Sequence, residues 1–324
     1  MQPAVTRYVN GEIRAYYTHS SPMTVGSLKP AATYSINPYT TDNSRWLTHA
    51  VSASLDRAVY LNRYSAICIN QTGHPLWRHD FEPSPESNSV AGGGCAFSRD
   101  GSHLWVYRPD AMNDCGPDLL VVLDASSGAE IAREELDSVG QGAIITVHPD
   151  GRNILFDVGE GQDGVKMYRA VLAGDNDKIE LHSYGWEDRC LLDMAPDGRT
   201  FMTVDHNVGD AAFHAFPGGD VLLRVSVEDF GYEGDEDDED DEACIHYIGG
   251  FLDLNTAVVT VKGETEDEEW VHYHAVDVRT GAHLGRLDAH PHNDEAEGFQ
   301  PLGDGTWVES DDGNVVRHRF VAAI

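Results

Sequence analysis

The stretch GAIITVHPDGRNILFDV, residues 142–158, holds two apolar runs rich in β-branched residues on either side of the turn signal HPDG. Asp-Gly between two such runs is the strongest short-range signal of a β-hairpin. Related turns, each between two apolar runs, recur along the chain at intervals of about 44 to 57 residues. They are SLDR at 54–57, SRDG at 98–101, APDG at 195–198, LDLN at 252–255 and LGDG at 302–305. The sequence therefore predicts one repeated unit that contains a hairpin.

A second turn lies inside each unit and joins a third β-rich run to a fourth. These turns are QTG at 71–73, SSG at 126–128, PGG at 217–219 and RTG at 279–281. Four antiparallel strands in a unit of roughly 40 to 50 residues are typical of a β-propeller blade. A blade cannot bury both of its faces alone, so blades must stack in a ring. Because helical periodicity is nowhere sustained, we predict an all-β fold, a single β-propeller of four-stranded antiparallel blades.

The number of blades follows from the innermost-strand signals, of which six are legible. The last unit ends after three strands, so a strand from the other end of the chain is expected to close the ring. The hairpin signal TRYVNGEIRAYY at 6–17, with its Asn10-Gly11 turn, is predicted to supply it. We therefore expect one domain over 1–324, with closing strands and a connection in 1–45 and six blades in 46–324. A seventh blade is expected only if residues 20–48 contain a degenerate one.

The repeat resembles that of the WD-repeat propellers. Each apolar run followed by SRDG or HPDG is similar to the end of that family's innermost strand, and HAVDVRTGAHLGRLDAH at 274–290 is similar to its third and fourth strands. The resemblance covers the chain from about Arg45 onward, and it implies the propeller fold. The Trp-Asp pair of the family is absent, since only its Asp is present, as Asp124 and Asp277, and the Gly-His pair is replaced by Ala289-His290. "WD-repeat-like" is therefore the description that the residues support.

The charge balance is strongly acidic, with 22 basic and 55 acidic residues and a formal net charge of −33. Such a surface repels phosphates and anionic lipid headgroups, which argues against nucleic acid and membrane as direct partners. It favours a basic protein segment or a small cation as partner. High acidity with little lysine is also typical of adaptation to a salty cytosol or of a GC-rich genome, and this alternative stays open.

The compartment is predicted from three absences. The sequence has no apolar stretch near the length of a membrane-spanning helix, and its start does not have the pattern of a signal peptide. Its five cysteines are an odd number without metal-ligand spacing such as C-x-x-C. We therefore expect a cytoplasmic protein without disulfides.

Two acidic runs dominate the second half of the chain, Asp235–Glu242 and Glu264–Glu269. The repeat places the first between two blades and the second between the second and third strands of the following blade. In propellers these two kinds of connection lie on the same face, so the runs are predicted to lie side by side on an acidic rim. A solvated loop without a partner is the alternative for the first run. The predicted partner-binding residues are Asp235, Glu236, Asp237, Asp238, Glu239, Asp240, Asp241, Glu242, Glu264, Glu266, Asp267, Glu268 and Glu269, with the aromatic anchors Trp186 and Trp270.

Catalytic chemistry has little support in the sequence. No nucleophile elbow, catalytic Cys-His pattern or P-loop is present, and no catalytic residue is predicted. The innermost strands place one carboxylate, Asp193, where a channel-bound cation would need several. The weak metal candidates are Asp193 and the cluster of His290, His292 and Asp294. The sequence thus favours a non-catalytic interaction scaffold without a cofactor, whose acidic rim docks a basic protein segment. The alternative is a lactonase-like hydrolase with a divalent cation in the central channel.

Overall fold

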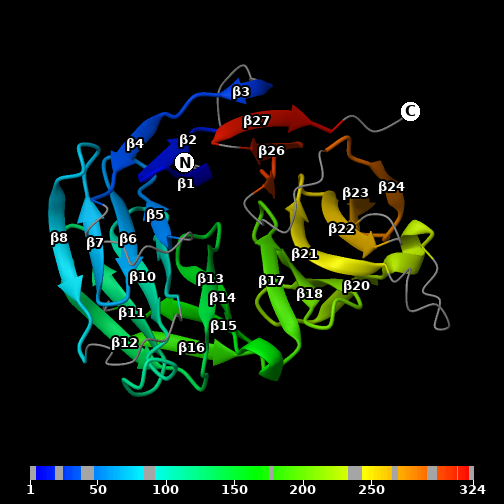
Figure 1. Cartoon of the computed structure of the whole chain (residues 1–324). Helices are drawn as coiled ribbons and strands as arrows, with labels where there is room; N and C mark the ends of the chain where they lie inside the picture. Colours follow the sequence, from blue (N-terminus) through cyan, green and yellow to red (C-terminus); the bar gives the residue numbers. More distant parts are fainter. Residues whose placement is uncertain are drawn as a thin grey trace. The chain divides into compact units, whose positions relative to one another are not determined.

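The computed structural model describes residues 5–18, 25–37, 47–83, 92–174, 178–232, 243–264, 269–289, 298–311 and 313–320. Within these ranges the elements are β-strands and two short 3-10 helices, η2 (Gly161–Asp163) and η3 (Val227–Phe230) (Figure 1). In the part of the chain so described, no helix has the length and apolarity needed to cross a membrane. All five cysteines are free.

The chain divides into two compact units, Met1–Ser21 with Lys29–Glu187, and Pro22–Leu28 with Asp188–Ile324. The first unit contains four antiparallel sheets. Their strands, in hydrogen-bonded order, are β1 (Val5–Val9), β2 (Glu12–Tyr16) and β4 (Ala32–Ser35); β5 (His49–Val51), β6 (Ala58–Asn62), β7 (Ser65–Ile69) and β8 (Pro75–Asp80); β9 (Gly94–Phe97), β10 (His103–Arg108), β11 (Leu119–Asp124) and β12 (Glu130–Glu135); and β13 (Gly142–Val147), β14 (Asn153–Gly159), β15 (Val165–Leu172) and β16 (Ile179–Ser183).

The second unit contains three antiparallel sheets of four strands. Their strands are β17 (Arg189–Met194), β18 (Thr200–Asp205), β19 (Ala211–Ala215) and β20 (Val221–Val225); β21 (Cys244–Phe251), β22 (Thr256–Glu264), β23 (Glu269–Asp277) and β24 (His283–Arg286); and β25 (Phe299–Pro301), β26 (Thr306–Asp311), β27 (Asn314–Arg319) and β3 (Gly26–Leu28). The Asp-Gly turns lie between the first and second strands and the second set of turns between the third and fourth. The predicted all-β propeller is confirmed.

The blade count differs from the prediction by one, because the described residues form seven sheets and not six. The N-terminal hairpin does not complete the last blade. Its strands β1 and β2 pair with each other, β2 also pairs with β4, and the three form a sheet of their own. The outer strand of the last sheet is β3, whose residues Gly26–Leu28 pair with β27. One sheet thus joins strands from near both ends of the chain, as predicted, but through a different segment.

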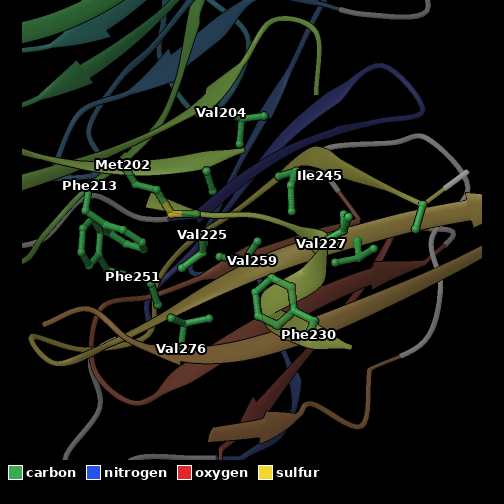
Figure 2. Packing of buried hydrophobic residues seen from close by; sticks show 14 of the residues in the cluster. Met202, Val204, Phe213, Val225, Val227, Phe230, Ile245, Phe251, Val259 and Val276 are labelled. Carbon is green, nitrogen blue, oxygen red and sulfur yellow. The ribbon is translucent and has the colours of Figure 1, made fainter. Parts of the chain in front are cut away.

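Successive sheets within each unit pack face to face. In the first unit β5 neighbours β9 and β9 neighbours β13, and in the second β17 neighbours β21 and β21 neighbours β25. The middle strands are buried on both faces, so their sequences are continuous apolar runs. Figure 2 shows one such interface, where Met202 and Phe213 of one sheet pack with Phe251, Val259 and Ile245 of the next. Burial of apolar side chains against a neighbouring sheet is the main force that holds a blade in place.

The turn aspartates hold the first connections by local hydrogen bonds. Asp124 Oδ1 accepts from the backbone N–H of Ser126 at 3.0 Å and of Ser127 at 2.8 Å. These bonds and those from the two serine hydroxyls lower the pKa of Asp124 to about 2. The same pattern, a carboxylate that accepts backbone N–H groups two or three residues on, recurs at Asp100, Asp150, Asp253 and Asp277. Part of the acidity of the chain therefore has a structural role.

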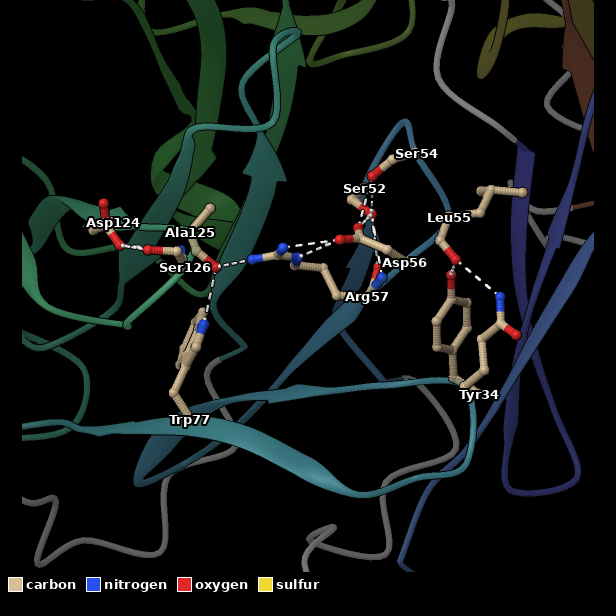
Figure 3. A network of polar contacts seen from close by, with 11 residues as sticks. Tyr34, Ser52, Ser54, Leu55, Asp56, Arg57, Trp77, Asp124, Ala125 and Ser126 are labelled. Carbon is tan, nitrogen blue, oxygen red and sulfur yellow. Dashed lines mark hydrogen bonds and ion pairs between the residues drawn. The ribbon is translucent and has the colours of Figure 1, made fainter.

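The same edge also joins neighbouring sheets of the first unit, as Figure 3 shows. The carbonyl oxygen of Ala125 accepts hydrogen bonds from Arg57 Nη1 at 2.8 Å and from Trp77 Nε1 at 3.0 Å. The Tyr34 hydroxyl donates to the carbonyl of Leu55 at 2.8 Å. These contacts connect three successive sheets through polar groups that would otherwise be buried without partners.

Candidate functional site

The two acidic runs join the strands that the sequence predicts. Asp235–Glu242 lies between β20 and β21, which belong to neighbouring sheets, and the second run joins β22 to β23. Residues Asp235–Glu242 and Glu266–Glu268 fall outside the described part of the chain. Glu264 and Glu269, the ends of the second run, are exposed and lie opposite each other in the ladder.

The described ends of the two runs meet through a pair of aromatic rings. Tyr232 stands three residues before Asp235, and Trp270 follows Glu269 directly. Their rings stack with centroids 5.1 Å apart and an interplanar angle of 20°. The indole of Trp270 lies against its ladder partner Gly263, where an added Cβ would come within 2.1 Å of the ring. Gly263 is therefore the residue that lets the indole lie flat on the strand.

A chain of hydrogen bonds runs inward from the Tyr232 hydroxyl. It accepts from Arg286 Nη2 at 2.9 Å and lies 2.9 Å from His272 Nδ1 and 3.0 Å from His274 Nε2. His274 Nδ1 lies 3.1 Å from His283 Nε2. A neutral imidazole has one donor and one acceptor, so the direction is set for the whole chain. When His283 donates to His274, His274 donates to Tyr232 and Tyr232 donates to His272.

The electrostatics of this cluster keep its histidines neutral. His274 is fully buried, and burial, followed by His283, Arg286 and His272, lowers its pKa to about 3. Burial and the charge of Arg286 also lower the pKa of His272. Burial raises the pKa of Tyr232, which Arg286 opposes. Arg286 is thus the charged member of the cluster at neutral pH.

The segment that leads into the first run is fixed from below. Helix η3 begins with a capping box in which Ser226 and Asp229 cap each other. Val227 and Phe230 of this helix enter the core that Figure 2 shows. The ring of Phe230 stacks on His274 with centroids 4.5 Å apart. Packing therefore holds Tyr232, two residues after Phe230, at a defined place beside Trp270.

The second aromatic anchor predicted from the sequence, Trp186, belongs to the first unit. There it stacks on Tyr184 with ring centroids 4.8 Å apart and an interplanar angle of 23°. Trp270 lies in the second unit. The two tryptophans therefore belong to different local environments.

Asp193, the channel candidate, links two neighbouring sheets. Its two carboxylate oxygens accept the backbone N–H groups of Met194 and Phe251, each at 2.8 Å. Gly250 permits the approach, since a Cβ there would lie 2.6 Å from Asp193 Oδ2. Enclosure of the carboxyl group raises its pKa to about 7, which the two hydrogen bonds oppose. This geometry is that of a structural clamp between β17 and β21.

Metal ligation has no geometric support among the described residues, in which no group of three or more His, Cys, Asp or Glu side chains is placed to hold an ion. His290, His292 and Asp294 lie outside the described residues. The sequence reasoning also missed a cluster, since it did not single out His272, His274, His283 or Arg286. The alternation of His272 and His274 along one strand was the available signal, because residues two apart share a face of the sheet.

Comparison with known proteins bears on the fold alone. No protein-family model matches the chain, and no curated protein matches it in sequence. Among solved structures, hydrazine synthase from Kuenenia stuttgartiensis is 15% identical over 82% of this chain and 76% of that one, with a TM-score of 0.52. BamB from Moraxella catarrhalis is 12% identical over 99% and 95% of the two chains, with a TM-score of 0.47. The Cps50 (Swd1) β-propeller domain from Myceliophteria thermophila is 6% identical over 85% and 96%, with a TM-score of 0.45. These proteins have diverse functions, and none of the likenesses indicates an activity for this chain.

Proposed function

We propose that the chain is a non-catalytic interaction scaffold whose acidic rim docks a basic protein segment. The observation that supports it best is the stack of Tyr232 on Trp270. It joins the described ends of the two acidic connections in one place on the second unit. Loops held by a rigid scaffold are the usual sites of recognition, and aromatic side chains beside them are the usual anchors.

The charge of the two runs determines the partner's chemistry. Eight carboxylates in Asp235–Glu242 and five in Glu264–Glu269 create a negative potential that attracts Lys and Arg side chains. Among the described residues, Lys262 pairs with Glu269 at 3.5 Å. Such complementarity accelerates association and selects partners by charge more than it adds affinity.

Two finer assignments belong to the same proposal. The propeller is WD-repeat-like, a description that rests on the residues compared above. Its compartment is the cytoplasm, because the five free cysteines fit a reducing environment.

The test is the binding of a peptide of about eight alternating Lys and Arg residues, measured by fluorescence anisotropy at ionic strengths of about 0.01 M and 0.15 M. Neutralising Asp235, Glu236, Asp237 and Asp238 with Asn and Gln should weaken binding about tenfold at the lower ionic strength. The matched control neutralises the same number of exposed carboxylates in the first unit, Glu135, Asp163, Glu180 and Glu187. Equal loss in the two variants would show that net charge, and not this rim, binds the peptide.

A further inference from the structure

We propose that Tyr232, Trp270 and His272 form a platform that binds an arginine side chain of the docking partner, and that Arg286 occupies this position in the free protein. The inference rests on the proposed function and narrows it, because it names the side chain that the partner inserts. The site is the aromatic array itself, and the carboxylates only surround it.

The three rings are arranged as one surface. Trp270 stacks on Tyr232 as described above, and its centroid lies 4.6 Å from that of His272. Tyr232 and His272 are nearly parallel, with an interplanar angle of 17° at 6.2 Å. All three side chains are half-buried, so their rings are held by packing but remain in contact with solvent. The faces of such rings carry partial negative charge and attract cations.

Arg286 shows which cation the platform accepts. Its guanidinium carbon lies 5.9 Å from the centroid of the Tyr232 ring, and its Nη2 donates to the Tyr232 hydroxyl. Within the described residues Arg286 forms no ion pair, although the chain carries a net charge of −33. The side chain is exposed on β24, the outer strand of its sheet. An arginine that lies on an aromatic ring in so acidic a protein marks that ring as a cation site.

Displacement of Arg286 by a partner's arginine is chemically balanced. Arg286 gives up one exposed hydrogen bond and one ring contact, and the incoming guanidinium makes both. The incoming group also brings further positive charge to Glu264, Glu269 and the runs beyond them. A planar guanidinium both stacks on a ring and donates within its plane, which the ammonium group of lysine does not do. The platform should therefore prefer arginine to lysine at equal charge.

The test titrates hexa-arginine and hexa-lysine peptides into the full chain by calorimetry at low ionic strength. Arg286→Gln should tighten hexa-arginine binding about fivefold, since it vacates the platform. Arg279→Gln is the matched control, because Arg279 is an exposed arginine of the same sheet whose loss changes the net charge equally. It should change binding of either peptide less than twofold, which is about the effect of one exposed charge.

Trp270→Leu should reduce the preference for arginine over lysine by about tenfold, and Trp270→Phe, which keeps a ring and serves as a folding control, should retain most of it. Equal tightening by Arg286→Gln and Arg279→Gln, or an unchanged preference in Trp270→Leu, would overturn the platform and leave the acidic docking surface standing. If neither peptide binds the wild type or Arg286→Gln, both the platform and the proposed function are wrong.

Discussion

Replacement of Asp118 by alanine should lower the free energy of unfolding by about 4 kcal/mol. Asp118 is fully buried and accepts four hydrogen bonds. The donors are the hydroxyls of Tyr107 and Ser138 and the backbone N–H of Gly140, each at 2.8 Å, and the N–H of Ala111 at 3.0 Å. Removal of the carboxylate leaves all four donors without a partner inside the first unit, and each then bears the cost of desolvation.

Chemical denaturation followed by circular dichroism measures this loss. Asp118→Asn should cost less than half as much, because the amide oxygen can still accept from the three donors that share Oδ2. Glu135→Gln is the control, since Glu135 is exposed and has no polar partner among the described residues. A loss below about 1 kcal/mol for Asp118→Ala would contradict the network, because an ordinary surface substitution does as much.

The stability of the fold should fall as the pH drops from 7.5 to 4.5, through two buried histidines of the second unit. Burial is the first cause that lowers the pKa of His214 to about 4 and that of His274 to about 3. In the unfolded chain both return to the ordinary value of 6.5, so the unfolded state binds more protons between these limits. The stabilisation is complete above pH 6.5 and is lost as the pH falls towards the folded pKa. Each histidine contributes a loss of roughly 2.5 kcal/mol by pH 4.5.

The surroundings of both histidines oppose protonation. His214 lies near Arg189 and Arg224, which reinforce the effect of burial, and Asp210 acts against it. The groups that face His274 are His283, Arg286 and His272, with Tyr232 as hydrogen-bond partner.

The measurement compares the change in unfolding free energy between pH 7.5 and 4.5 across variants, because protonation of crowded carboxylates shifts the total in the opposite direction. His214→Gln and His274→Gln should each reduce the pH-dependent change by about 2 kcal/mol, whatever their stability at neutral pH. His74→Gln, which removes an exposed histidine of the first unit, should leave it unchanged. A pH dependence that is the same in all three variants would contradict the burial of the two imidazoles.

The features that the sequence predicted are local ones. An Asp-Gly turn such as Asp150-Gly151 sets its own geometry, because the aspartate accepts the N–H groups of Arg152 and Asn153 and the glycine has a φ of 73°. The middle strands could be recognised because burial on both faces requires continuous apolar runs. The connections that carry the acidic runs follow from strand order alone, so their placement was predicted as well.

The features that the sequence missed depend on contacts between distant segments. Strand β3 has three residues, too few to show a period, and its pairing with β27 is a tertiary choice. The same holds for the cluster around Tyr232, which reaches its histidines only because η3 packs Phe230 onto His274. Asp193 was visible as an unusual carboxylate, but its bond to the N–H of Phe251 needed the bulge at Gly249 and Gly250 in the next sheet.

The central claim is that the two acidic connections form one surface, and a double-mutant cycle of stability tests it most directly. One variant neutralises Asp235–Glu242 and the other Glu264, Glu266, Asp267 and Glu268; Glu269 is kept because it pairs with Lys262. The Debye length is about 30 Å at 0.01 M salt and about 8 Å at 0.15 M, so neighbouring runs repel each other mainly at low ionic strength. We predict that the wild type gains stability with salt. The two neutralisations together should stabilise by at least about 0.5 kcal/mol less than their sum at 0.01 M, and nearly additively at 0.15 M. Strict additivity at both ionic strengths would place the runs apart and contradict a single acidic surface.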